Sequence, residues 1–193
     1  MLPSATEEIA SAAARLVVDE GMEYALAKRK AARHFGPPTR GRPELPSNEQ
    51  VEDEVRAYLE LFHADTQPAE LRALRELALR WMQRLAAFRP HLGGAVWRGT
   101  ATRLSAIHLD LYCDDPKAAE IELINQGVDY DAAGDDKLPV LSLAARCAAF
   151  GEPVTLHLAV RDLDDQRGAL KPDARGRSWR GDTAALQRLL ESR

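Results

Sequence analysis

The sequence is poor in cysteine, in long apolar runs and in excess positive charge, and each scarcity excludes a class of protein. Its 193 residues include only two cysteines, Cys113 and Cys147. Their spacing matches no zinc or redox motif, so we expect a protein of the reducing cytoplasm. No apolar run approaches the roughly 20 residues that a membrane span needs. Residues 1–8 lack the regions of a signal peptide, and no internal repeat is present.

The charge balance argues against a general affinity for nucleic acid. The net charge is -4, with 45% hydrophobic and 29% charged residues, which is ordinary for a globular protein. One local exception is the stretch Lys28–Arg42, which is basic and contains no acidic residue. It predicts at most weak, salt-sensitive contacts with phosphates. Its alternative interpretation is a solvated helix face that pairs with acidic residues elsewhere.

The first half of the chain has helical periodicity. Apolar residues recur at intervals of three or four, and glycine or proline interrupts each run. Ser47 or Asn48 is a suitable N-cap for the third run. The predicted helices cover 5–20, 22–35, 48–64 and 67 to about 88. We therefore expect an N-terminal helical region, 1–66, before a second domain, 67–193.

After Gly94 the period changes from helical to alternating, which is typical of strands. We predict adjacent antiparallel strands at 94–98 and 105–113, with the helix 68–88 packed on one face. The remaining predictions are strands at 128–130, 138–148 and 153–161, helices at 116–126 and 183–190, and a loop over 166–181. The fold class expected is α+β, in which N-terminal helices precede a mixed β-sheet core with flanking helices.

The Gly99-Thr100 turn and the segment Ser105–Asp110 resemble the nucleotidyltransferase superfamily of DNA polymerase β type, over roughly residues 70–161. Small bacterial proteins of this size look similar. The family pattern is an apolar residue, Gly, Gly or Ser, a spacer, and Asp-apolar-Asp/Glu, with a third carboxylate on a later strand. The resemblance implies a sheet core of nucleotidyltransferase type, a nucleoside triphosphate as partner, Mg²⁺ or Mn²⁺ as cofactor, and transfer of a nucleotidyl group to a hydroxyl.

Two carboxylates at positions i and i+2 of a strand point to one face, where they hold the metal ions that clamp the triphosphate. This sequence departs from that pattern. If Ser105 aligns with the family's serine, the carboxylate positions become Ala106 and His108. If Asp110 is the first carboxylate, its partner position is Tyr112. The resemblance implies these site residues: catalytic Asp110, His108 and His157; nucleotide-binding Gly99, Thr100, Arg103 and Ser105; metal-binding Asp110 and His108.

Three functions remain open at this point. The first is a nucleotidyltransferase-like protein that binds a nucleoside triphosphate and transfers a nucleotidyl group, with Asp110 as its most sensitive residue. The second is a catalytically inactive relative that serves as a binding or regulatory protein. The third is a helical nucleic-acid-binding module. The imidazoles and Asp110 could instead be polar residues on an open sheet face, and the oligomeric state is not predicted.

Overall fold

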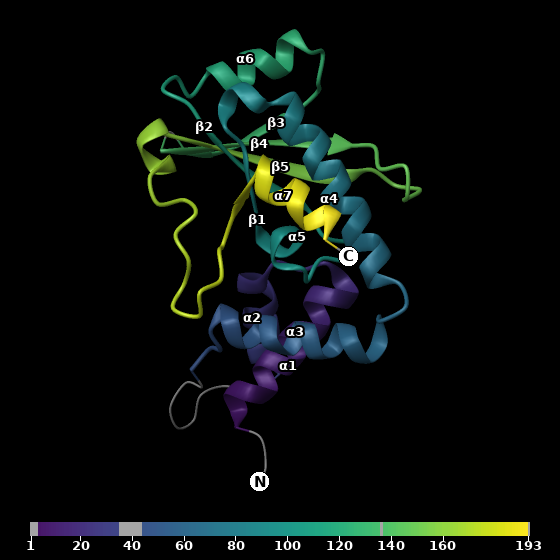
Figure 1. The fold of residues 1–193 in the computed structure, drawn as a ribbon. Helices are drawn as coiled ribbons and strands as arrows, with labels where there is room; N and C mark the ends of the chain where they lie inside the picture. The colour runs from purple at the N-terminus through teal and green to yellow at the C-terminus, as the bar shows by residue number, and fades with distance from the viewer. Residues whose placement is uncertain (1–3, 35–43, 136, 193) are drawn as a thin grey trace. The chain divides into compact units, whose positions relative to one another are not determined.

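The computed structural model describes residues 4–34, 44–135 and 137–192 (Figure 1). The chain divides into two compact units, Met1–Pro68 and Ala69–Arg193. Each unit has its own apolar core. Within the described ranges, no helix is both long enough and apolar enough to cross a membrane.

The first unit contains the helices α1 (Ala5–Glu20), α2 (Tyr24–Arg33) and α3 (Asn48–Phe62), close to the predicted bounds. Ser4 caps α1 and Ser47 caps α3. Each serine side chain accepts a hydrogen bond from the backbone N–H three residues on, and the Glu7 or Gln50 side chain there accepts one from the serine's own backbone N–H. The core of this unit consists of small and branched apolar residues: Ile9, Ala10, Ala13, Ala14, Val18, Ala27, Ala31, Val51, Val55 and Leu59.

The second unit is a mixed sheet with helices, which confirms the predicted α+β class. Its helical elements are α4 (Gln67–Arg84), η1 (Ala86–Phe88), α5 (Gly94–Arg98), α6 (Ala118–Asn125), η2 (Leu163–Gln166) and α7 (Thr183–Glu191). Its strands are β1 (His91–Gly93), β2 (Ile107–Tyr112), β3 (Asp131–Asp135), β4 (Leu138–Ala145), β5 (Val154–Arg161) and β6 (Gly181–Asp182). The strand order is β3-β4-β5-β2-β1-β6. The β2–β5 pair is parallel, and the other neighbours are antiparallel.

Alternation along the strands gives the sheet two chemically different faces. In β2, Ile107, Leu109 and Leu111 are buried, whereas His108 and Asp110 between them are partly exposed. The buried side packs on α4, α6 and α7, and α4 and α7 lie over the sheet in Figure 1. We call the other side the polar face; it carries His108, Asp110, Ser142, His157 and Arg161.

The predicted strand at 94–98 is wrong, because these residues form the single-turn helix α5. The antiparallel partner of β2 is instead β1, which immediately precedes α5 in the chain. In this pair, His91 lies opposite Asp110. Arg75 of α4 explains the helical turn, since its guanidinium donates to the carbonyl oxygens of Val96 and Trp97, at 3.0 and 3.1 Å. An apolar run of five residues does not distinguish a strand from a buried helical turn.

Two further predictions need correction. The short strand expected at 128–130 begins later, at Asp131, and is the edge strand β3. The predicted loop 166–181 ends in β6, whose two residues pair with β1. The strands at 105–113, 138–148 and 153–161 and the helices at 116–126 and 183–190 are confirmed in substance by β2, β4, β5, α6 and α7.

Candidate functional site

Asp110 lies between two guanidinium groups on the polar face. Its Oδ1 is 2.9 Å from Nε of Arg161, and its Oδ2 accepts a hydrogen bond from Nε of Arg180. The Asp110 side chain is 12% exposed, against 27% for Arg161 and 32% for Arg180. Both carboxylate oxygens therefore face a cationic side chain, and little of the carboxylate faces water.

This arrangement affects the neighbouring ionisable groups. Burial lowers the pKa of Arg161, but its contact with Asp110 and the charge of that carboxylate outweigh the burial and raise the pKa above its usual value. Burial raises the pKa of Tyr112, and the charge of Asp110 adds to that effect while both arginines oppose it. Arg161 is therefore a permanent cation at any physiological pH.

Two imidazoles and a hydroxyl lie on the same face of the sheet as the carboxylate. His108 and His157 occupy paired positions of β2 and β5, with ring centroids 5.0 Å apart. Ser142, from β4, places its Oγ 2.8 Å from Nδ1 of His157. The structure thus brings His108, Asp110 and His157 onto one face of the sheet.

A glycine pair brings the backbone close to the imidazole of His108. Gly93 lies opposite His108 in the β1–β2 ladder, and Gly94 has a φ of +65°, which favours glycine. A Cβ on Gly94 would lie 3.2 Å from Cδ2 of His108. Leu92, Gly93 and Gly94 therefore form an apolar-Gly-Gly segment beside β2.

The four predicted nucleotide-binding residues lie elsewhere. Gly99 ends α5, at the other end of that helix from the glycine pair, and Thr100 is buried. The backbone N–H of Arg103 donates to Glu70 of α4, at 2.9 Å. Ser105 closes a local turn, in which its Oγ accepts from the backbone of Thr102 at 3.0 Å. Their role in nucleotide binding stays a prediction.

The predicted metal ligands do not fit a divalent cation. A magnesium site needs carboxylate oxygens that are free to coordinate, whereas both oxygens of Asp110 already contact guanidinium groups. A divalent cation beside Asp110 would be repelled by the two guanidinium groups that already contact this carboxylate. Among the described residues, no group of three or more His, Cys, Asp and Glu side chains has metal-binding geometry.

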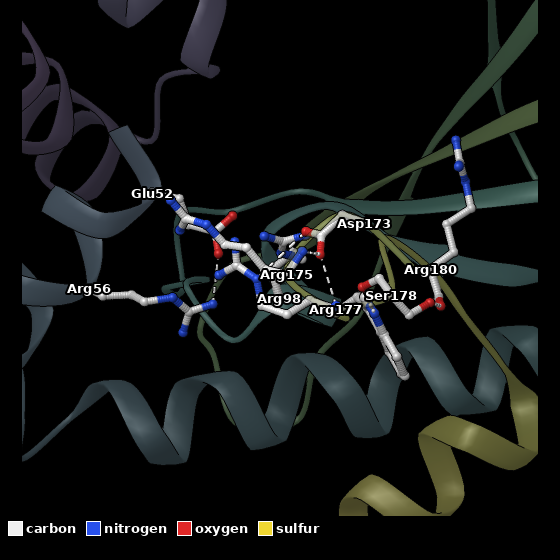
Figure 2. Close-up of polar contacts among 9 residues, drawn as sticks. Glu52, Arg56, Arg98, Asp173, Arg175, Arg177, Ser178 and Arg180 are labelled. Carbon is white, nitrogen blue, oxygen red and sulfur yellow. Dashed lines mark hydrogen bonds and ion pairs between the residues drawn. The ribbon is translucent and has the colours of Figure 1, made fainter. Parts of the chain in front are cut away.

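Arg180 follows a loop in which the side chain of Asp173 accepts hydrogen bonds from the backbone. Asp173 accepts hydrogen bonds from the backbone of Arg175 and of Arg177, both at 2.9 Å, and the Arg177 bond is the main cause of its lowered pKa. Arg98 stacks on the Trp179 ring, with Cζ 4.0 Å from the centroid. Figure 2 shows the Arg180 guanidinium extending away from this cluster. The loop fixes the backbone from which Arg180 reaches Asp110.

Sequence reasoning missed Arg161, Arg180 and Ser142. Arg161 ends the predicted strand 153–161 and lies four residues after His157, so strand alternation alone could have placed it on the polar face. Arg180 gave no such signal, because it precedes a two-residue strand inside an expected loop.

The basic stretch lies in the first unit, and its Arg40 and Arg42 are outside the described residues. Lys28 donates to Pro46 and Asn48, and Lys30 pairs with Glu20 at 2.7 Å. Of these partners, only Glu20 is an acidic residue. Both the solvated helix face and nucleic-acid binding stay predictions.

The sequence matches no protein-family model, and no curated protein matches it significantly. Among solved structures, the chain is similar to the Cid1 poly(U) polymerase with MgGTP bound, at 18% identity and a TM-score of 0.37, over 56% of this chain and 38% of that chain. Cid1 in complex with the UTP analog UMPNPP gives 17% identity and a TM-score of 0.37, over 56% and 36%. A cytoplasmic RNA terminal U-transferase gives 18% and 0.36, over 56% and 36%. The chain covers at most 38% of the length of these three proteins.

Proposed function

We propose that this chain is a nucleotidyltransferase-like protein that binds a nucleoside triphosphate on its polar face and does not transfer the nucleotidyl group. One observation carries the proposal. The carboxylate of Asp110 is the only one within β2, and Arg161 and Arg180 hold both of its oxygens.

Metal-dependent transfer needs paired carboxylates that hold the cation between the phosphates and the attacking hydroxyl. In β2 the alternating positions on the polar face are His108, Asp110 and Tyr112, so Asp110 has no second carboxylate on its strand. Imidazole nitrogen is a poor ligand for Mg²⁺. The same side chains suit an anionic ligand, since guanidinium and imidazole N–H groups donate to phosphate oxygens.

The experiment measures binding and transfer on the full chain. Calorimetry with each of the four ribonucleoside triphosphates, with Mg²⁺ and with Mn²⁺, should detect binding. Incubation with α-labelled triphosphates and an RNA oligonucleotide should leave the label unincorporated. Label incorporation that Asp110→Asn abolishes would establish a transferase instead, with Asp110, His108 and His157 in catalytic roles. Failure of every triphosphate to bind would refute the proposal.

A further inference from the structure

We infer that the polar face binds the phosphate chain without a divalent cation, with the guanidinium groups of Arg161 and Arg180 as the cations that contact it. This inference rests on the proposed function and specifies how the ligand is held.

The two guanidiniums are oriented but not saturated by Asp110. An arginine side chain has five N–H donors, one on Nε and four on the two Nη atoms. Both arginines approach Asp110 through Nε. In the part of the chain that the structure describes, neither has a protein hydrogen bond through its Nη atoms. The Nη groups are the donors that a phosphate oxygen can accept from, in pairs of parallel bonds.

The charge balance favours an anion at this place. Two arginines and one aspartate give a formal charge of +1. The charge of Asp165 on η2 also acts on Arg161. Asp182, beside Arg180 in the chain, uses its carboxylate to cap α7, where it accepts from Ala185 at 2.8 Å. No acidic side chain other than Asp110 is in an ion pair with either arginine among the described residues.

The imidazoles extend the site along the strand. His108 is two residues before Asp110, about 7 Å along β2 on the same face. A chain of linked phosphates that contacts the guanidiniums can therefore extend along the strand towards His108.

Replacing Asp110 should then affect phosphate binding in the opposite direction to that expected for a metal site. Where a metal bridges protein and phosphate, replacing Asp110 by asparagine removes a ligand and abolishes binding. Here Asp110 is an anion that repels the phosphate and offsets the charge of the arginines that bind it. Asp110→Asn raises the formal charge of the group from +1 to +2, so we expect phosphate binding at least as tight as in the unsubstituted chain.

The test uses inorganic tripolyphosphate and UTP, titrated calorimetrically into the full chain in EDTA and in Mg²⁺. We expect dissociation constants that agree within about threefold between the two buffers. Arg180→Gln and Arg161→Gln should each weaken binding by about tenfold, a typical effect of losing one charge-assisted hydrogen bond. Arg188→Gln is the matched control, because Arg188 is an exposed arginine of α7, on the opposite side of the sheet. Thermal melting establishes that each variant is folded.

Three results would overturn the inference. Binding that EDTA abolishes would show a metal-bridged site and leave the proposed function standing. Binding that resists EDTA but ignores both arginine substitutions would place the phosphates elsewhere. Loss of binding in folded Asp110→Asn would make Asp110 a ligand rather than a competitor. If Asp110→Asn does not fold, the EDTA comparison on the unsubstituted chain still decides the question. If neither probe binds in any buffer, the proposed function fails as well.

Discussion

Gly181 offers a sharp test of how β6 packs, because its lack of a side chain is what admits the indole ring of Trp97. A Cβ at this position would lie 2.2 Å from both Cη2 and Cζ3 of Trp97, and 2.7 Å from Cε3. The ring has little room to move away, since its Nε1 donates to the carbonyl oxygen of Ser178 at 2.9 Å. Gly181→Ala must therefore displace either α5 or β6.

The expected magnitude follows from two opposing effects. Overpacking of a well-filled site costs about 1–3 kcal/mol. Replacing glycine by alanine also restricts the unfolded chain, which stabilises the protein by about 0.4–1 kcal/mol where the backbone conformation suits alanine. We expect Gly181→Ala to lower the free energy of unfolding by about 1–2 kcal/mol. The matched control is Gly151→Ala, because a Cβ on Gly151 meets no atom within 4 Å.

Urea unfolding followed by tryptophan fluorescence is the assay. The three tryptophans of the chain, Trp81, Trp97 and Trp179, all belong to the second unit, so the signal reports on that unit alone. The midpoint should fall for Gly181→Ala and stay level or rise for Gly151→Ala. In a Trp97→Leu background the cost of Gly181→Ala should shrink towards that of the control. Equal midpoints for the two alanine variants would refute the packing of Trp97 on β6.

Other predictions concern the core, the loop before β6 and a thiol. Leu109→Ala, at a site that is 1% exposed, should cost about 2–5 kcal/mol, whereas Leu104→Ala at an exposed site should cost under about 0.5 kcal/mol, both measured by urea unfolding. The backbone hydrogen bond from Arg177 is the main cause that lowers the pKa of Asp173, so its stabilisation is present above the unfolded pKa of about 3.9 and is lost as the pH falls through the folded value. Asp173→Asn should accordingly flatten the decrease in stability below about pH 4 in acid titrations followed by fluorescence. Burial first, and then nearby acidic residues, raise the pKa of Cys113, so its alkylation by iodoacetamide should be slower at pH 8 than that of a free thiol, and a rate equal to the free thiol's would contradict this.

Sequence periodicity predicted the type of element correctly wherever the run of residues was long enough to show a period. The helix α4 has 18 residues and β5 has eight, and both were predicted close to their observed bounds. The run 94–98 has five residues, and its conformation depends on a guanidinium from α4, 21 and 22 residues earlier in the chain. No local pattern contains that information, because the contact exists only after α4 has packed on the sheet.

Part of the candidate site was predictable from the alternation of side chains along the strands. Alternation placed His108, Asp110 and His157 on one face, since their positions follow from the strands that carry them. The charge around Asp110 was not predictable, because Arg180 comes from a chain segment 70 residues later. An aspartate on a strand has the same sequence signature whether it holds a metal or an arginine. Only the tertiary pairing distinguishes the two.

The register of β1 against β2 determines which side chain lies next to the glycine pair. The glycine pair lies beside His108, because Gly93 and His108 are opposite each other, whereas Asp110 lies opposite His91. The side chain next to the glycine turn is thus an imidazole, and the only carboxylate of β2 is one alternation further along, within reach of Arg161 on the parallel neighbour β5. This register places the glycine turn beside an imidazole and separates it from the only carboxylate of β2.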